Sequence, residues 1–289
     1  MLSLSAFEQM QRSRTVTTQS EKAAAFKALH AAPGAFVIPN PWDIGSAKLL
    51  ALGGYKALAT TSAGMAWSLG RPDGGVSREE ALAHGRAIAA ATPLPVSADL
   101  ENGFGDAPAD CAETVRGAAA AGLVGCSIED STGRAGEPIY PLELAVARVQ
   151  AAVAAARALP FPFMLTARAE NFLHGRADIE DTLRRLRAFA AAGADVLYAP
   201  GLATREQIAA VVKAVAPKPV NLLASPALGA ITVTEIGGLG VKRISVGGLL
   251  ARAAYGSALR AAREMATGGT FGFAKDAVPF AELNGMFKA

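Results

Sequence analysis

Short apolar runs alternate with longer amphipathic segments along most of the chain. Each run has the length of a buried β-strand, and each following segment repeats its apolar positions at helical spacing. The predicted strands cover residues 35–39, 57–61, 96–100, 125–129, 163–167, 195–198, 219–223 and 243–246. Eight such units predict an α/β fold, a (β/α)8 TIM barrel of parallel strands covered by helices. An open doubly wound sheet is the alternative, but no Gly-x-Gly-x-x-Gly segment follows the first strand.

The predicted helices begin and end at residues that favour helix caps and helix breaks. Asp43 is a suitable N-cap for the second helix, and Gly53-Gly54 follows its end. Helices are expected at residues 20–31, 44–52, 108–121, 178–191, 204–215, 232–238 and 249–265, and two more begin near residues 77 and 141. No linker is visible, so we predict a single barrel domain over residues 1–289.

The C-terminal segment 270–289 is rich in aromatic residues. It carries Phe271, Phe273, Phe280 and Phe287. That much aromatic surface is unfavourable on a free tail in water. We therefore predict that this segment packs on the barrel or on another subunit and serves oligomerisation.

The composition argues against several classes of function. The chain has 289 residues, of which 51% are hydrophobic and 18% charged, and a formal net charge of +3. Its Lys and Arg residues are scattered, which disfavours nucleic-acid binding, and no apolar stretch is long enough to span a membrane. Residues 1–14 lack the apolar core of a signal peptide, and Cys111 and Cys126 form no Cys-x-x-Cys pattern. We expect a reduced, cytoplasmic protein whose two cysteines are structural.

Two carboxylates stand side by side where the third predicted strand ends. Asp99 and Glu101 are two residues apart, so on an extended chain they point to the same face. Gly103 and Gly105 then allow the backbone to turn sharply. Like charges packed together raise each other's cost of ionisation, and a divalent cation removes that cost. The alternative is a solvated strand end that is merely acidic.

Other strand ends contribute further charged groups, and active sites of such barrels lie at those ends. Asp73 and Glu129 join the first pair, which gives four hard oxygen ligands without a His or Cys cluster. This donor set favours Mg2+, or Mn2+, over Zn2+. Arg168, at the end of the fifth strand, is suited to pair with a substrate carboxylate.

Each of these groups also has a purely structural interpretation. Glu129 or Asp130 would then bond backbone amides of a loop. Arg168 would pair with Glu170 or Glu129. His174 is more typical of a loop residue than of a catalyst. The residues by themselves leave these alternatives open.

Taken together, these residues resemble the isocitrate lyase/phosphoenolpyruvate mutase superfamily over nearly the whole chain. The motifs that carry the resemblance are Asn40-Pro-Trp-Asp43, Thr61-Ser-Ala63, Gly70-Arg-Pro-Asp73, Asp99-Leu-Glu-Asn-Gly-Phe-Gly105, Ser127-Ile-Glu-Asp130, Thr166-Ala-Arg168 and Ser245-Val-Gly-Gly248. The resemblance implies a (β/α)8 barrel whose C-terminal helices swap between the subunits of a homodimer, usually within a homotetramer.

The resemblance assigns a metal site to the acidic cluster. In that family Mg2+ is held, largely through water, by carboxylates that match Asp99, Glu101 and Glu129. Asp73 lies close by, and Arg168 matches the arginine that faces the substrate's second anionic group. Asp73, Glu129 and Arg168 are therefore the catalytic candidates.

Substrate binding is expected at two further places. The Thr61 hydroxyl and the Ser62 and Ala63 amides match the family segment that holds the pyruvyl part of a 2-oxo acid. Asn221 lies within the seventh predicted strand, two residues before its end, and is a further candidate for substrate choice.

The loop 131–140 is expected to act as a lid. Gly133 and Gly136 make it flexible, and its position after the fourth strand places it over the metal. Arg134 is its cation and the natural contact for a distal carboxylate or phosphonate. The alternative is a solvated Arg134 paired with Glu137.

The same loop departs from the family pattern. Isocitrate and methylisocitrate lyases carry a Lys-Lys/Arg-Cys-Gly-His segment there, whereas this chain reads Ser131-Thr-Gly-Arg134 and lacks that general acid. The phosphomutases carry a Lys and an Asn in the loop and a His-Ser after the sixth strand, where this chain has Tyr198-Ala-Pro200. What remains is the shared chemistry, a metal-bound pyruvate enolate.

We therefore expect a Mg2+-dependent lyase that cleaves a C–C or P–C bond of a small 2-oxo acid or 2-hydroxy polycarboxylate through that enolate. Oxaloacetate decarboxylation needs no further acid and suits the altered loop, and methylisocitrate lyase-like cleavage belongs to the same class. Phosphonopyruvate hydrolase and phosphoenolpyruvate phosphomutase activities are alternatives within the family. A non-catalytic barrel that binds a 2-oxo acid is the alternative from another class. The expected partners are a small anionic substrate and further copies of the chain.

Overall fold

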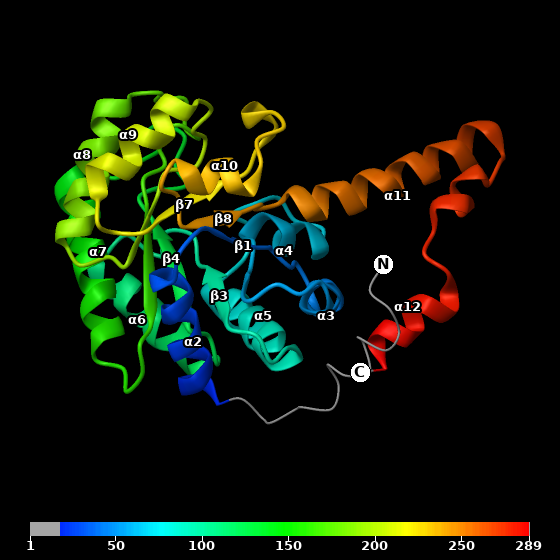
Figure 1. Cartoon of the computed structure of the whole chain (residues 1–289), viewed down its shortest axis with the longest axis horizontal. Helices are drawn as coiled ribbons and strands as arrows, with labels where there is room; N and C mark the ends of the chain where they lie inside the picture. The colour runs from blue at the N-terminus through cyan, green and yellow to red at the C-terminus, as the bar shows by residue number, and fades with distance from the viewer. Residues whose placement is uncertain (1–17, 289) are drawn as a thin grey trace.

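The structure, a computed structural model, describes residues 18–288. Among these residues, eight parallel strands form one sheet in the order β1-β8-β7-β6-β5-β4-β3-β2, surrounded by helices (Figure 1). The strands are β1 (Phe36–Ile38), β2 (Leu58–Ala59), β3 (Val96–Asp99), β4 (Gly125–Glu129), β5 (Met164–Arg168), β6 (Val196–Tyr198), β7 (Val220–Leu223) and β8 (Arg243–Ser245). The predicted (β/α)8 barrel is confirmed.

The barrel is nearly closed, and its seam lies between β1 and β2. The backbone contact there is a bond of 3.1 Å from the Ala59 amide to the Pro39 carbonyl. The Asn40 side chain adds to it, because its amide donates to the Thr60 carbonyl at 3.0 Å. Its oxygen accepts from both backbone amides of residues 246–247, each at 2.9 Å. Asn40 therefore ties together the ends of β1, β2 and β8.

Helices cover the outside of the barrel, and most begin at side chains that cap them. They are α2 (Gln19–Ala31), α3 (Ile44–Leu52), α4 (Ser62–Ser68), α5 (Arg78–Ala91), α6 (Pro108–Ala120), α7 (Leu142–Arg157), α8 (Ile179–Ala191), α9 (Arg205–Val215), α10 (Val233–Gly238) and α11 (Leu249–Gly268). The Asp43 side chain accepts from the Ser46 amide at 2.6 Å, as expected of an N-cap. The sequence predicted no helix between the second strand, 57–61, and the helix that begins near residue 77, but the structure has the short helix α4 there. Thr61 caps α4 by accepting from the Gly64 amide at 3.3 Å.

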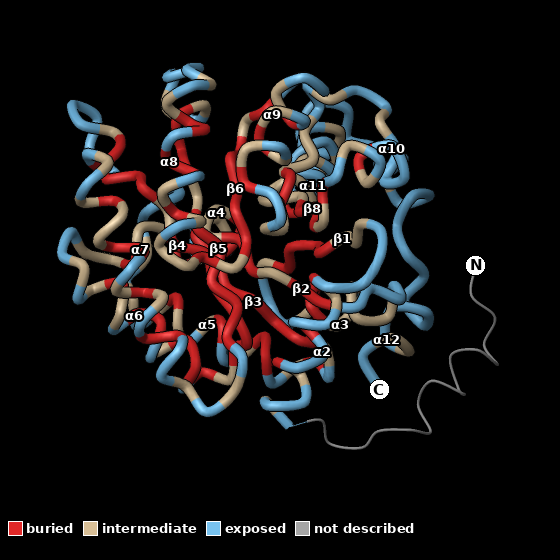
Figure 2. Tube along the Cα trace, turned by 60° about the vertical axis from the view of Figure 1, so that its left-hand side comes forward, coloured by how far each residue is buried: buried red, intermediate tan, exposed pale blue. Residues whose placement is uncertain are grey.

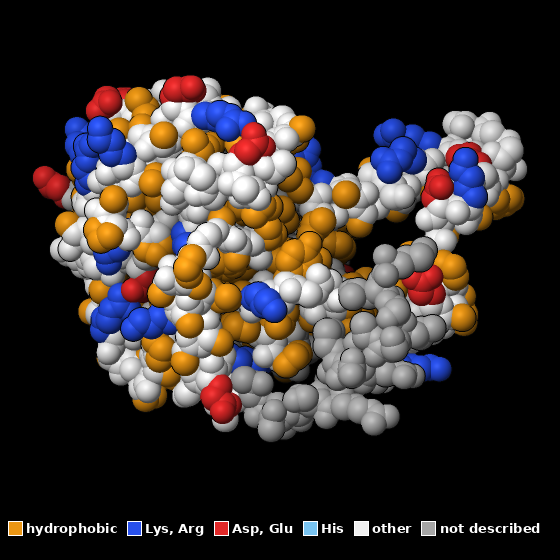
Figure 3. Space-filling model, viewed as in Figure 1, with side chains coloured by type: hydrophobic (Ala, Val, Ile, Leu, Met, Phe, Trp, Pro, Cys, Tyr) orange, Lys and Arg blue, Asp and Glu red, His pale blue; other side chains and the backbone are white. Residues whose placement is uncertain are grey.

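The strands and the inner faces of the helices form the core (Figure 2). Cys111 and Cys126 are free thiols within this core, which agrees with a structural role. On the face shown in Figure 3, Lys and Arg side chains are interspersed with acidic and apolar ones. None of the helices within residues 18–288 combines the length and the apolar character that crossing a membrane requires.

The C-terminal part of the chain leaves the barrel. α11 extends away from it, and η2 (Gly272–Asp276) and α12 (Phe280–Phe287) follow, with α12 returning toward α3 (Figure 1). Phe287 lies against Gly45 at the start of α3. Phe271 and Phe280, by contrast, are 68% and 84% exposed within the single chain. Packing of this segment on another subunit, with exchange of the helices, remains a prediction.

Candidate functional site

Charged side chains from β3, β4 and β5 meet at the carboxyl end of the barrel. Arg168, the last residue of β5, donates from Nη1 to Asp99 at 2.9 Å and from Nε to Glu170 at 2.8 Å. Its Nη2 pairs with Glu129 at 3.1 Å. These four side chains are at most 17% exposed. In this arrangement Arg168 neutralises carboxylates of the protein, which is the structural role that the sequence left open.

Asp99 is the centre of a hydrogen-bond network. Ser62 donates to its Oδ2 through both the backbone amide, at 3.2 Å, and the hydroxyl, at 3.0 Å. The Ser127 hydroxyl donates to Oδ1 at 3.2 Å. The predicted pyruvyl-binding segment therefore contacts the acidic cluster, because Thr61 caps α4, Ser62 and Ala63 open it, and Ser62 holds Asp99.

Glu101 has an unusual backbone conformation and one carboxyl oxygen that lacks a partner in the part of the chain that the structure describes. Its φ is +48°, which is uncommon for a residue other than glycine. Its Oε1 is buried and has no hydrogen-bond partner among residues 18–288. Burial and the charges of Asp99 and Asp73 raise the pKa of Glu101 to about 7, against the opposing effect of Arg168. An orphaned carboxylate oxygen of this kind is a suitable ligand for a cation.

The other two acids are also poorly stabilised as anions. Burial raises the pKa of Glu129 well above its usual value, and the nearby carboxylates add to this effect while Arg168 opposes it. Asp73 lies on the exposed loop between α4 and α5. Partial burial of its carboxyl group and the Asp99 charge raise its pKa, while a hydrogen bond with Ser62 lowers it. The site thus holds more negative charge than Arg168 balances.

The arrangement suits a hydrated metal ion better than a directly coordinated one. Within residues 18–288, no three His, Cys, Asp or Glu side chains already converge as direct ligands. Mg2+ usually keeps several of its waters and binds directly to only one or two carboxylates. Together with the orphaned oxygen of Glu101, the acidic cluster therefore fits a divalent ion held partly through water.

The turn that carries Glu101 is held in place by Arg148 of α7, a residue that sequence analysis missed. Arg148 is fully buried. Its guanidinium donates to three backbone carbonyls, those of Asn102, Gly105 and Asp106. It also lies over the Tyr140 ring, 4.2 Å from the centroid. The sequence did contain a signal for Arg148, because it is a charged residue on the buried face of an Ala-rich helix.

The loop 131–140 forms a short hairpin beside this turn, with its two ends paired as an antiparallel bridge. Arg134 donates from Nη1 to both carboxylate oxygens of Asp106, at 3.0 and 2.8 Å. The alternative of a solvated, paired Arg134 therefore agrees with the structure in its exposure, but its partner is Asp106 and not Glu137. Both members of the Arg134–Asp106 pair are exposed, with 48% and 60% of their side chains accessible. A contact between Arg134 and substrate remains a prediction.

Asp130 and His174 support the loops around the site. Asp130 accepts from the Glu170 amide at 2.8 Å and pairs with Arg185 at 3.0 Å. Asp130 thus has the structural role that the sequence left open. His174 approaches the Ser131 hydroxyl at 3.1 Å, at the base of the loop 131–140.

A cavity of about 50 Å³ extends from Asp99 and Arg168 into the barrel interior. Asn221 lines it and is already bonded at both ends of its amide. Its nitrogen donates to the Ser245 hydroxyl at 2.9 Å, and its oxygen accepts from Nε of Arg243 at 2.7 Å. The cavity is also lined by Asp99, Arg168 and Tyr198.

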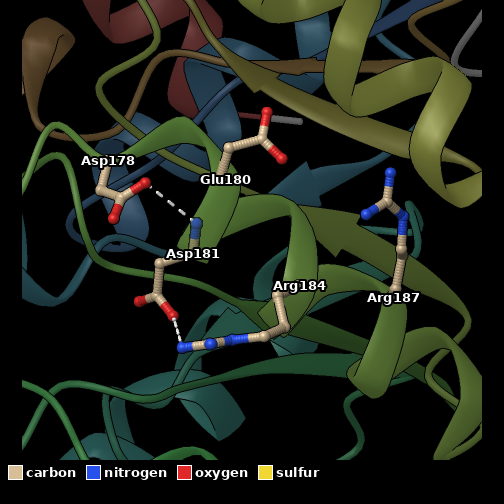
Figure 4. Close-up of a pocket in the computed structure, with 5 residues that line it drawn as sticks. All are labelled: Asp178, Glu180, Asp181, Arg184 and Arg187. Carbon is tan, nitrogen blue, oxygen red and sulfur yellow. Dashed lines mark hydrogen bonds and ion pairs between the residues drawn. The ribbon is translucent and has the colours of Figure 1, made fainter.

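A larger hollow, of about 490 Å³, lies outside the barrel at the start of α8 (Figure 4). Asp178 caps α8 there by accepting from the Asp181 amide at 3.1 Å. Asp181 in turn pairs with Arg184. Since these groups already have structural partners, we place the functional site at the end of the barrel.

Comparison with known families identifies the family of the chain. Residues 26–266 match the phosphoenolpyruvate phosphomutase family. The chain belongs to this family. The superfamily that the sequence motifs suggested is thereby confirmed.

Relatives of this phosphomutase family resemble the chain over most of its length. A crystal structure of a provisionally assigned lyase/mutase from Burkholderia cenocepacia is 59% identical, covers 94% of this chain and 97% of its own, and has a TM-score of 0.91. An uncharacterised protein of Mycobacterium tuberculosis is 34% identical over 261 residues, 89% of this chain and 94% of its own. Oxaloacetate acetylhydrolase in complex with the product oxalate is 28% identical, covers 93% and 94% of the two chains, and has a TM-score of 0.84. Lyases such as 2-methylisocitrate lyase and oxaloacetate decarboxylase match shorter parts of the chain.

Proposed function

We propose that the chain is a Mg2+-dependent carbon–carbon lyase, with Mn2+ as an alternative ion, acting on a small 2-oxo acid or 2-hydroxy polycarboxylate. Lyases among its relatives support this class. The observation that carries the proposal is the acidic cluster around Arg168, in which Glu101 keeps a buried oxygen without a partner. We retain the prediction of a cytoplasmic homodimer or homotetramer.

The metal ion would be held by Asp99, Glu101 and Glu129, mostly through water, with Asp73 nearby. A divalent cation bound there supplies positive charge near the substrate oxygen that becomes negative as the carbon–carbon bond breaks. Because the metal ion would balance the negative charge of these carboxylates, Arg168 would be free to pair with a substrate carboxylate.

The start of α4 contributes fixed dipoles to the same place. Ser62 is bonded to Asp99, so the amides of Ser62 and Ala63 lie beside the acidic cluster. Backbone amides and the Thr61 hydroxyl would orient the pyruvyl part of the substrate and stabilise its developing charge. Because these donors are part of a folded helix, they need little reorganisation when the reaction occurs.

Two kinds of cleavage fall within this proposal. Decarboxylation of a 2-oxo acid needs no protein acid to break the bond, which suits a loop 131–140 without Cys or His. Cleavage of a 2-hydroxy polycarboxylate uses the same enolate chemistry. Phosphonate chemistry is less favoured, because Arg134 is the cation of that loop and is already paired with Asp106.

The test is a parallel assay of oxaloacetate, 2-methylisocitrate, isocitrate and phosphonopyruvate, with release of pyruvate, glyoxylate and phosphate measured. Each reaction is run with Mg2+ and with excess EDTA. Since free divalent ions also promote oxaloacetate decarboxylation, Asp99→Asn at the same ion concentration is the control. We expect Mg2+-dependent turnover by the wild type that the variant loses. Full activity in EDTA would exclude the metal, and no turnover of any substrate would favour the non-catalytic barrel.

A further inference from the structure

The barrel interior contains a buried cation that no carboxylate of residues 18–288 neutralises. Arg243 opens β8 and is 6% exposed. Its Nε donates to Asn221 at 2.7 Å, and its Nη2 donates to the Thr166 hydroxyl at 2.9 Å. Its Nη1 lies 3.5 Å from Nε2 of His30. Burying a charge without an opposite charge is costly, so such a group calls for an explanation.

All three partners of Arg243 are neutral. The His30 ring packs edge-on between the rings of Phe26 and Phe36, and its Nδ1 lies 2.8 Å from the Phe26 carbonyl, to which it donates. Burial and the charge of Arg243 lower the pKa of His30 to about 3, so its Nε2 accepts and carries no proton. Burial lowers the pKa of Arg243 itself to about 10, which leaves the guanidinium charged at neutral pH.

Two other arginines buried near the site, Arg168 and Arg185, have carboxylate partners, whereas the buried Arg148 donates to three backbone carbonyls. Arg168 pairs with Asp99, Glu129 and Glu170. Arg185 pairs with Asp130 at 3.0 Å and with Asp181 at 2.9 Å. The guanidinium of Arg243 has five N–H groups, of which three are accounted for by its neutral partners. Its charge and its remaining donors are available to an anion.

Arg243 lines the same cavity as Asp99 and Arg168, so the cation is reached from the acidic cluster. An internal space needs roughly 10–15 Å³ to hold one water, so about 50 Å³ has room for a carboxylate. The cavity wall also carries polar side chains from several strands, among them Ser97, Ser127, Tyr198, Asn221 and Ser245. Barrel interiors of this fold are usually filled by Val, Ile and Leu. A hollow, polar interior is therefore better explained by a polar ligand than by stability.

We propose that the floor of this cavity is an anion subsite, in which Arg243 binds the distal carboxylate of a dicarboxylic 2-oxo or 2-hydroxy acid. This inference rests on the proposed lyase function and names the substrate class of the same site. The reacting end of the substrate stays at the acidic cluster, and the distal end points into the barrel. Arg243, rather than the exposed Arg134, then determines specificity. A carboxylate paired with a guanidinium is stabilised as an anion and is therefore hard to release as CO2. This subsite thus suits cleavage of a 2-hydroxy polycarboxylate, whose distal carboxylate remains in the product, better than decarboxylation of oxaloacetate, which loses that carboxylate.

The test compares binding of two unreactive acids of equal length, 2-oxoglutarate and 2-oxopentanoate, which differ only in the distal carboxylate. Isothermal titration calorimetry is done on the full chain with Mg2+ and with EDTA, at constant ionic strength. The variants are Arg243→Gln, Arg243→Lys and Arg134→Ala. Arg205→Gln is the charge-matched control, since Arg205 pairs with Glu235 on the surface and 54% of its side chain is exposed.

We expect the wild type to bind the dicarboxylate about tenfold or more tightly than its monocarboxylate analogue. Arg243→Gln should abolish this preference, Arg243→Lys should keep part of it, and Arg205→Gln should keep it all. Equal binding of the two acids by the wild type would overturn the proposal, and so would loss of the preference in Arg134→Ala but not in Arg243→Gln. If Arg243→Gln does not fold, the wild-type comparison and Arg243→Lys still decide. Because neither acid needs to react, this result is independent of the lyase assay.

Discussion

Replacing Glu101 by Gln should change the stability of the protein in opposite directions without and with a divalent ion. In the metal-free protein the pKa of Glu101 is raised from 4.5 to about 7, so the fold disfavours the ionised group. One pKa unit corresponds to about 1.36 kcal/mol, so the difference between these values gives an upper limit of about 3.4 kcal/mol. Because the carboxyl group is partly solvated, we expect about 2 kcal/mol after screening.

The direction in which pH changes the stability follows from proton binding. Between pH 4.5 and about 7 the folded state holds a proton on Glu101 that the unfolded chain has released. The free energy of unfolding therefore falls as the pH rises through this range, and the full cost is present above it. Gln cannot ionise, so Glu101→Gln should be more stable than the wild type by about 2 kcal/mol at pH 8. The difference should shrink as the pH is lowered toward 5.

Urea unfolding in EDTA at pH 8 and pH 5, followed by circular dichroism, measures this difference. Glu137→Gln is the matched control, because Glu137 is exposed on the loop 131–140. Adding Mg2+ should make the wild type more stable than Glu101→Gln, since the wild-type carboxylate contributes to the ion's site and the Gln amide carries no charge. A variant no more stable than the wild type at pH 8 in EDTA would refute the argument from burial and like charge. Equal stabilisation of both proteins by Mg2+ would remove Glu101 from the metal site.

Two further predictions concern the support of the site and the C-terminal segment. Arg148→Met should lower the free energy of unfolding by about 3 kcal/mol, because buried carbonyls lose their donor. The same variant should weaken Mg2+ binding. Arg148→Lys should have a stability and a Mg2+ affinity between those of the wild type and Arg148→Met. Urea unfolding and calorimetric metal titration measure both effects, and unchanged Mg2+ affinity in a folded variant would contradict the positioning role. Truncation after Gly269 removes the exposed Phe271 and Phe280 and should dissociate the oligomer or cause aggregation. Light scattering after gel filtration checks this, and an unchanged mass would count against it.

The barrel and the place of its site were predictable because both depend on local patterns. Apolar runs of strand length followed by amphipathic segments indicated all eight strands, and strand order placed Asp99, Glu129 and Arg168 at one edge. α4 was missed because it is a short helix of seven residues in a segment that reads as a loop. Its cap, Thr61, was attributed to substrate binding alone.

The remaining features depend on contacts between segments far apart in the sequence. Arg148 bonds carbonyls more than 40 positions earlier in the chain, so its helix gave no sign of which backbone it holds. Arg134 pairs with Asp106 across two loops, and no local rule favoured that partner over Glu137. The position of Arg243 could be partly predicted from the sequence, since it lies two residues before Ser245 and shares its face of the strand. That all its partners are neutral emerges only from the folded barrel.

The seam tied by Asn40 gives the barrel a preferred place to open. Neighbouring strands elsewhere share ladders of backbone bonds, whereas β1 and β2 are joined by the Ala59 amide and the Asn40 side chain. Local opening costs little where few bonds must break, so the Ala59 amide should lose its proton to deuterated solvent much sooner than amides between β4 and β5. Because β2 stays paired with β3 when the seam opens, Ser62 keeps its contact with Asp99. Solvent then has a side entrance to the barrel interior that does not depend on the loop 131–140.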